Sequence, residues 1–245
     1  MIIESQNDVT RAVLGEMQRT PDPRTKEILE ALVKHLHAFI REVRLTEKEF
    51  QEAIGLVNAI GKHTTESHNE AMLLAGALGV SNLVCLMNNG ARGTRPTQAN
   101  NLGPFYRAGS PRCANGDSLL RSATDGTPLV TTDAAGAFSF RSVKPAGYPV
   151  PTDGPTGALL RAQRRHNFRP AHLHFLIFKP GFKTIASQVY DPEDPHLETD
   201  SQFGVTKALI GKFEKREERY FLEFAFVLEP GESSLPAAPI SGKQR

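Results

Sequence analysis

Two pairs of histidines, each separated by one residue, have a spacing that could place two imidazoles on one metal ion. His172 and His174 lie in the segment 171–178, whose other side chains are apolar and predict a β-strand. Side chains two apart on a strand point to the same face, so both rings can approach one ion. The spacing alone is a weak motif, and two hydrogen-bonded core histidines are the alternative interpretation.

The other pair, His35 and His37, lies in a segment with helical periodicity. Side chains two apart on a helix point about 200° apart around its axis, so these two rings cannot easily share an ion. We expect them at the edge of the helix's apolar stripe, making ordinary hydrogen bonds.

Tyr148 is the third candidate ligand. It lies in the proline-rich turn 147–151, where proline restricts the backbone, and it is one of only four tyrosines in the chain. A phenolate and two imidazoles combine hard and borderline donors, a set that suits Fe(III) better than structural zinc. Taken alone, a tyrosine at this position is more often a packed turn residue.

The elements that must position these side chains begin with helices. Apolar residues recur every three or four positions over 24–43, which predicts a helix with one buried stripe. A capping box and similar apolar spacing predict further helices over 46–61, 66–78 and 81–87. We therefore expect a helical region over residues 1–90.

Beyond the Gly-, Asn- and Pro-rich loop 88–104, the pattern changes to short strands separated by turns. Strands are predicted over 137–143, 171–178, 184–190 and 220–228. The fold class predicted is α+β, with a mostly antiparallel β-sandwich over residues 91–232 after the helical region. The polar, proline-containing tail 233–245 is expected to be flexible.

Composition sets limits on function. The chain has 245 residues, 39% of them hydrophobic and 23% charged, which is ordinary for a globular protein. Its formal charge of +2 gives no support for a nucleic-acid or membrane-surface partner. Two cysteines do not make a disulfide framework, and we find neither a membrane span nor a signal peptide. We expect a cytoplasmic protein.

Around the candidate ligands, the sequence resembles the intradiol ring-cleaving dioxygenases. The similarity covers most of the chain in the family's order, in the segments 35–39 (HLHAF), 102–106 (LGPFY), 148–155 (YPVPTDGP), 169–175 (RPAHLHF) and 203–205 (FGV). The GPFY segment with Arg107 is most similar to hydroxyquinol 1,2-dioxygenases, with catechol and chlorocatechol 1,2-dioxygenases close behind.

The resemblance implies a homodimer formed through the helical region, and an oxidoreductase site in the β-sandwich. It implies a non-haem Fe(III) held by two tyrosines and two histidines, of which Tyr148, His172 and His174 match three. Arg169 matches an arginine over the substrate ring, Gln188 matches a polar residue beside it, and Tyr148 also matches a general base.

The implied reaction is cleavage of hydroxyquinol or catechol between its two hydroxyl-bearing carbons, with O2 as co-substrate. It belongs to the catabolism of aromatic compounds, and its product is a maleylacetate or a cis,cis-muconate. The sequence leaves the exact diol open.

The second tyrosine ligand has no counterpart in this chain. In the family, several tens of residues separate two landmarks that are adjacent here, at Val130 and Thr131. That segment carries the tyrosine and usually a tryptophan, and this chain has no tryptophan. The sequence thus predicts an internal deletion, with missing strands and an incomplete ligand set. Tyr106 and Tyr190 could substitute, but their matching positions do not bind iron in the family.

Three functions follow from these observations. The first is an active intradiol dioxygenase. The second is a catalytically inactive variant that acts at most as a dimerisation partner of a full-length enzyme. The third is a β-sandwich that binds small molecules without redox chemistry, which is disfavoured because a simple binder has no need of two histidines on one strand face.

Overall fold

The computed structural model describes residues 2–88, 96–121 and 128–243. The chain divides into two compact units, Met1–Val57 and Asn58–Arg245. The division falls within helix α3 (Glu47–His63), which matches the helix predicted over 46–61 and extends two residues past Gly61.

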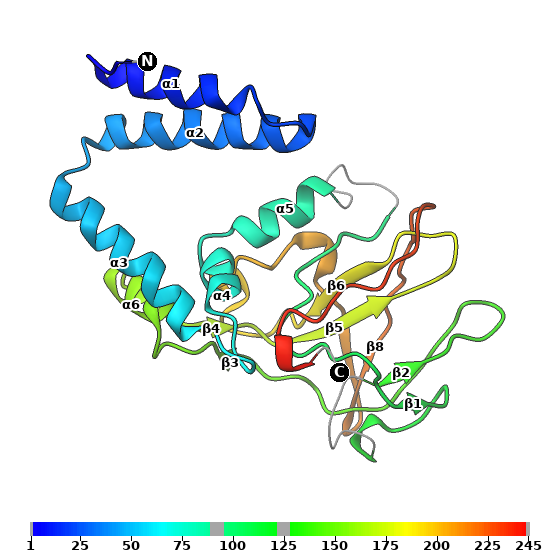
Figure 1. The fold of residues 1–245 in the computed structure, drawn as a ribbon. Coiled ribbons are helices and arrows are strands. Elements are labelled where there is room, and N and C mark those ends of the chain that lie inside the picture. Colours follow the sequence, from blue (N-terminus) through cyan, green and yellow to red (C-terminus); the bar gives the residue numbers. More distant parts are fainter. Residues whose placement is uncertain (1, 89–95, 122–127, 244–245) are drawn as a thin grey trace. The chain divides into compact units, whose positions relative to one another are not determined.

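The first unit consists of helices α1 (Gln6–Met17) and α2 (Pro23–Val43), followed by the start of α3. Helix α2 begins where predicted, because the Asp22 side chain accepts the Thr25 amide at 2.7 Å. Helix α1 was not predicted from the sequence. It packs along α2, as Figure 1 shows.

The apolar stripe predicted for α2 is only partly covered. Helix α1 lies along one side of α2, where Leu29, Val33 and Ile40 are half-buried. The rest of the stripe is 48–57% exposed, at Ile28, Leu32, Leu36, Phe39 and Val43. The expectation of a stripe buried within the chain is therefore wrong, because one neighbouring helix is too narrow to cover it. His37 makes the ordinary contact expected, with its Nδ1 2.9 Å from the Thr10 hydroxyl.

The second unit begins with the end of α3 and the short helices α4 (Glu70–Ala77) and α5 (Val80–Asn88), which correspond to the helices predicted over 66–78 and 81–87. Helix α4 starts later than predicted because Asn69 caps it, accepting the Met72 amide at 3.0 Å. Helix α6 (Pro155–Ala162) was not predicted. Among the described residues no single helix is long and apolar enough to cross a membrane; only α4 and α5 taken together, bent by 78°, reach that length and composition.

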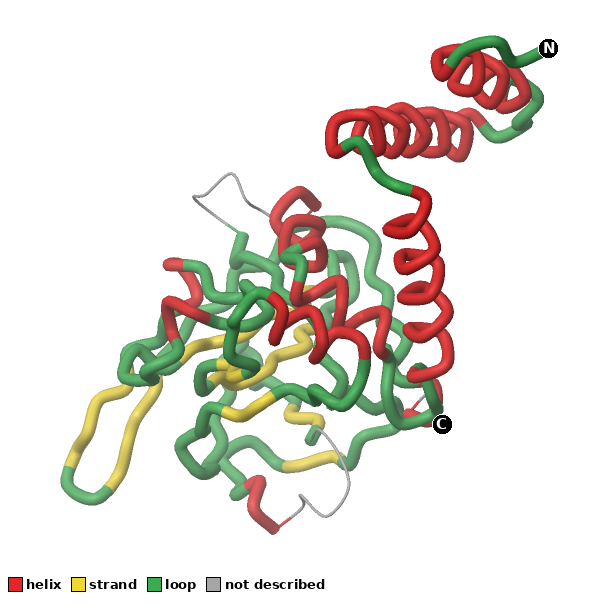
Figure 2. The backbone as a smooth tube through the Cα atoms, turned by 90° about the vertical axis from the view of Figure 1, so that its left-hand side faces the viewer, coloured by secondary structure: helices red, strands yellow, loops and turns green. Residues whose placement is uncertain are grey.

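The strands of this unit form four two-stranded sheets. The pairs are β1 (Arg112–Cys113) with β2 (Leu129–Val130), β3 (Tyr148–Pro149) with β4 (Phe168–Arg169), β5 (His172–Ile177) with β6 (Ile185–Tyr190), and β7 (Phe213–Arg216) with β8 (Arg219–Leu222). The first pair is parallel and the other three are antiparallel. Figure 2 shows these strands as short pieces joined by long loops. The predicted α+β class, with a helical N-terminal region followed by sheets, is confirmed, and the described strands form no closed barrel.

Two predicted strands differ from the structure. The segment 137–143 forms only an isolated bridge, at Arg141, and the strand predicted over 220–228 ends at Leu222. The alternating phenylalanines of 137–143 instead pack by their rings: Phe138 and Phe140 both contact Phe175 of β5, at 6.3 Å between ring centroids. Apolar alternation reports which side chains are buried, whereas a strand also needs a neighbouring backbone to pair with.

The C-terminal residues, expected to be flexible, pack against other parts of the second unit. Ala238 and Ile240 are buried, and a short 3-10 helix covers Ser241–Lys243 (red in Figure 1). The Asn69 amide donates to the Pro239 carbonyl at 3.1 Å, and the Lys243 ammonium donates to the Pro104 carbonyl at 2.7 Å. The tail thus contacts both the start of α4 and the GPFY segment.

Candidate functional site

The β5–β6 hairpin carries the centre of the candidate site. In its register His172 lies opposite Tyr190, and His174 lies opposite Gln188, so these four side chains share one face of the ladder. The Nε2 atoms of the two histidines are 3.1 Å apart. The strand periodicity therefore places the two imidazoles together, as the sequence predicts.

His172 is held in a tautomer that can bind a metal through Nε2, and both imidazoles are neutral. The Nδ1 of His172 lies 2.6 Å from the Pro170 carbonyl oxygen, which can only accept, so Nδ1 carries the proton and the lone pair is on Nε2. Burial, followed by the nearby Arg169 cation, lowers the pKa of His172 to about 4. Burial likewise lowers the pKa of His174 to about 3. Both rings are therefore neutral near pH 7.

Tyr148 joins the two histidines from strand β3. Its ring centroid lies 5.6 Å from that of His172, and its register partner in β4 is Arg169. Within the described part of the chain, no residue forms a hydrogen bond with the Tyr148 hydroxyl. Phe105, from the GPFY segment, packs edge-on against the tyrosine ring at 5.9 Å. The phenol is thus positioned by ring packing while its oxygen remains available.

A buried ion pair lies beside the histidines. Arg169 and Asp200 are each 4% exposed. The guanidinium donates through Nε to Asp200 Oδ1 and through Nη2 to Asp200 Oδ2, both at 3.1 Å. Its Nη1 lies 3.3 Å from the Nε2 of His172. Burial acts to raise the pKa of Asp200, but Arg169 outweighs it, and the pKa lies below its usual value.

Gln188 and Tyr190 complete this polar network. Arg169 Nη2 donates to the Gln188 side-chain oxygen at 3.1 Å and lies 3.2 Å from the Tyr190 hydroxyl. The Tyr190 hydroxyl itself donates to Gln188. Burial raises the pKa of Tyr190 despite the nearby arginine. Tyr190 is therefore a neutral phenol whose hydroxyl is already hydrogen-bonded to Arg169 and Gln188, so it does not suit the role of a substitute iron ligand.

The backbone conformation and surroundings of Gly103 show why the first position of the GPFY segment requires glycine. Its φ is +74°, and a Cβ built on it would lie 2.6 Å from the Cε1 of His174. Any other residue would therefore overlap the histidine ring and strain the backbone. Gly204 of the FGV segment is similar, because its Cβ would lie 2.8 Å from Arg169 Nη2. Both glycines let the backbone approach site side chains closely.

Sequence reasoning missed Asp200, and it found Tyr190 only as a poor substitute ligand. The available signal for Asp200 was its place just before the 203–205 segment, to which no role was assigned. In the structure Asp200 Oδ2 accepts the Gly204 amide at 2.8 Å, so the segment and the aspartate form one unit.

The donor chemistry fits a ferric ion in part. Two neutral imidazoles and a phenol combine borderline and hard ligands. Among the described residues no group of three or more His, Cys, Asp and Glu could hold a metal, so the site depends on Tyr148 joining His172 and His174. The second tyrosine expected from the resemblance is absent from this group.

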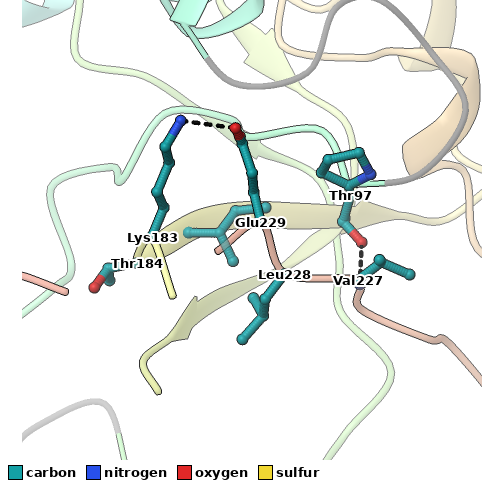
Figure 3. Close-up of a pocket in the computed structure, with 8 residues that line it drawn as sticks. Thr97, Lys183, Thr184, Val227, Leu228 and Glu229 are labelled. Atoms are coloured by element: carbon teal, nitrogen blue, oxygen red, sulfur yellow. Dashed lines mark hydrogen bonds and ion pairs between the residues drawn. The ribbon is translucent and has the colours of Figure 1, made fainter. Parts of the chain in front are cut away.

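A separate cavity lies at the other end of the β5–β6 ladder, and Figure 3 shows it. It is lined by Thr97, Lys183 and Thr184, with Val227 and Glu229 opposite them. Its volume is about 20 Å³, enough for water and too small for an aromatic ring. The Thr184 hydroxyl is buried there without a hydrogen-bond partner among the described residues, so a water fits the cavity better than a substrate.

Two family profiles and several known proteins match most of the chain. The sequence profile described as "Dioxygenase" matches residues 97–230, and that described as "Catechol dioxygenase N terminus" matches residues 22–95. The chain is 34% identical to 6-chlorohydroxyquinol 1,2-dioxygenase of Cupriavidus pinatubonensis, over 92% of this chain and 98% of that protein. It is also 34% identical to hydroxyquinol 1,2-dioxygenase of Nocardioides simplex, over 86% of each.

Solved structures agree as well. Hydroxyquinol 1,2-dioxygenase from Pseudomonas putida superimposes with a TM-score of 0.81 at 29% identity, covering 92% of this chain and 99% of that one. Catechol 1,2-dioxygenase from Acinetobacter shares the fold, with a TM-score of 0.74 at 21% identity, covering 93% of this chain and 94% of that one.

The alignment lengths bear on the predicted deletion. The Cupriavidus alignment has 270 positions, although it covers 92% of this chain, or about 225 of 245 residues. About 45 aligned positions therefore face gaps in this chain, which agrees with an internal segment of several tens of residues being missing. Its location between Val130 and Thr131 remains a prediction. Both profiles and the relatives identify the chain as a member of the intradiol ring-cleaving dioxygenase family.

Proposed function

We propose that this chain cleaves hydroxyquinol or a catechol between its two hydroxyl-bearing carbons, with a non-haem Fe(III) held by Tyr148, His172 and His174. The observation that carries the proposal is the pair of neutral imidazoles with facing Nε2 atoms 3.1 Å apart, next to a phenol without a hydrogen-bond partner among the described residues. Relatives named hydroxyquinol 1,2-dioxygenase support this choice of diol.

The bound iron would supply Lewis-acid chemistry, lowering the pKa of the diol hydroxyls so that the diol binds as a dianion. Tyr148, which would hold the iron as its phenolate, would accept a proton from the diol on its oxygen. Arg169 would stabilise negative charge on the diol oxygens through Nη1, the nitrogen that faces His172. Gln188, whose amide donates to the Asn101 carbonyl at 2.8 Å, would fix the arginine on its other side.

The reaction adds both atoms of O2 to the diol and breaks the ring carbon–carbon bond between the hydroxyls. Catechol would give cis,cis-muconate, and hydroxyquinol would give maleylacetate through its enol form. Phe105 would form part of the wall against which the ring packs, because it already contacts Tyr148.

We also propose that two copies associate through the helical region. The stripe of α2 that α1 leaves exposed recurs every three or four residues along one face, which is the pattern of a helix that packs on another helix. Sedimentation velocity is expected to give a dimer, and replacing Leu32 and Leu36 by glutamate is expected to give a monomer. A wild-type chain that sediments only as a monomer would remove the proposal.

A second candidate function, a catalytically inactive variant, is favoured by the missing tyrosine and the 45 or so missing aligned positions. Such a chain would retain the helical region and act as a dimerisation partner of a full-length enzyme. No observation favours a metal-free small-molecule binder.

Metal content and the visible absorption spectrum of the purified chain separate these functions. A tyrosinate-to-ferric band that shifts on adding catechol or hydroxyquinol is expected if Tyr148 and the histidines assemble a working site. A Tyr148→Phe variant is the matched control and should lack the band. Protein that stays colourless and iron-free after anaerobic ferrous loading and reoxidation would favour the inactive variant.

A further inference from the structure

The carboxylate of Asp200 accepts hydrogen bonds from backbone N–H groups of its own loop, independently of any contact with another side chain. Its Oδ1 accepts the Gln202 amide at 3.1 Å, and its Oδ2 accepts the Gly204 amide at 2.8 Å. Both carboxylate oxygens are thus held by backbone donors within four residues. A carboxylate held in this way is a rigid acceptor for any cation that reaches it.

Arg169 donates two hydrogen bonds to the Asp200 carboxylate, one from Nε and one from Nη2, along one side of the guanidinium. Two parallel hydrogen bonds define the plane of a guanidinium as well as its position. Nη2 also contacts the Gln188 side-chain oxygen and the Tyr190 hydroxyl, and Nη1 is the nitrogen that lies beside His172. The contact of Nη1 with His172 uses the lone pair that a metal would take, so metal binding would leave Nη1 free for a diol oxygen.

We propose that Asp200 is a positioning residue for the ring-cleavage site: its carboxylate holds Arg169 so that Nη1 faces the diol bound beside His172. The inference rests on the proposed function and assigns Asp200 no contact with the diol. The buried negative charge also balances the buried arginine, which otherwise would stand uncompensated in the protein interior.

Asp200→Asn tests the inference because the amide is nearly isosteric and cannot reproduce the contacts. The carboxylate accepts four N–H groups, two on each oxygen, from Gln202, Gly204 and Arg169, so in either orientation the amide nitrogen of Asn faces two donors. Asp191→Asn is the matched control. Asp191 is also 4% exposed and also ion-paired, but its partner is Lys144.

The first readout needs neither iron nor turnover. Exchange of arginine Nε–H protons with solvent can be followed by NMR on the ¹⁵N-labelled chain, with the Arg169 signal assigned by its loss in Arg169→Gln. We expect slow exchange in the wild type and in Asp191→Asn. In Asp200→Asn, loss of charge-assisted bonds is expected to speed exchange about tenfold or more. Exchange as slow as in the wild type would overturn the inference.

The second readout is diol affinity, measured by anaerobic calorimetry with hydroxyquinol on the iron-loaded chain. Asp200→Asn is expected to weaken binding by roughly tenfold or more, as loss of a charge-assisted contact does. In the Arg169→Gln background the same change should add less than about twofold, because coupled residues are not additive. An equal loss in both backgrounds would mean that Asp200 does not act through Arg169.

Folding is checked by the amide NMR spectrum of each variant. If Asp200→Asn does not fold, Asp200→Glu keeps the charge but displaces the carboxylate by one methylene group. It should still speed exchange of the Arg169 proton and weaken diol binding, and no change in either would overturn the inference. If the wild-type chain binds no diol, the proposed function fails, and the exchange comparison alone decides whether Asp200 holds Arg169.

Discussion

Replacing Gly103 by alanine tests whether the GPFY segment positions His174. The new methyl group would lie 2.6 Å from Cε1 of the histidine ring and 3.0 Å from its Nε2. Contacts this short must be relieved by moving the ring or the loop. The φ of +74° adds a backbone cost, because L-residues disfavour this region by about 1–2 kcal/mol.

Gly109→Ala separates the two costs. Gly109 has nearly the same φ, +71°, and a Cβ built there meets no atom within 4 Å. It should therefore show the backbone cost alone, about 1–2 kcal/mol. Gly103→Ala should add about 1–3 kcal/mol for the overlap, as overpacked sites do. The expected difference between the two variants is thus the cost of displacing His174.

Urea unfolding followed by tyrosine fluorescence is a suitable assay. All four tyrosines lie in the second unit and the chain has no tryptophan, so the signal reports on that unit alone. Iron uptake is measured in parallel and should fall in Gly103→Ala but not in Gly109→Ala. Equal destabilisation of the two variants, with equal iron uptake, would refute the idea that Gly103 positions the histidine.

Three further predictions concern buried polar groups. The depressed pKa values of His172 and His174 mean that both are neutral when folded, so the unfolding free energy of the metal-free chain should fall as the pH drops from about 6.5 towards 4. His174→Leu should flatten that pH profile in urea titrations, and an unchanged slope would count against the burial of a neutral ring. Glu70→Gln should cost about 1–3 kcal/mol in the same assay at pH 7, because the buried carboxylate accepts the Thr156 amide at 2.7 Å and contacts His68 at 2.6 Å. Burial acts to raise the pKa of Glu70, but these hydrogen bonds outweigh it and the pKa lies below its usual value. The stabilisation by the Glu70 carboxylate should therefore be present at neutral pH and disappear below about pH 4. A destabilisation by Glu70→Gln that persists in acid would contradict this.

Much of the site follows from local sequence. The alternation around His172 and His174 predicts a strand, and a strand's period of two is enough to place both rings on one face. Helix α2 is equally local, because its apolar spacing and the Asp22 cap lie within a few residues of one another. The proline-rich turn already singled out Tyr148, and the resemblance to a known family added Arg169 and Gln188.

The tertiary structure decided what touches these residues. Asp200 lies 31 positions from Arg169, and the two meet only because the loop 200–204 folds back beside β4 and β5. The same is true of Gly103 against His174 and of the tail against Pro104. No sequence period relates such segments, so their pairing depends on the shape of the folded chain.

Two of the expectations that differ from the structure have the same cause. Periodicity showed that one face of α2 and the alternate residues of 137–143 are apolar, and both observations hold. What covers an apolar face, and which backbone pairs with a strand, depends on neighbours elsewhere in the chain or in another copy. Residue types and their periodicity predict which side chains are apolar and which can bind a metal, whereas the partners that these side chains meet depend on the tertiary structure.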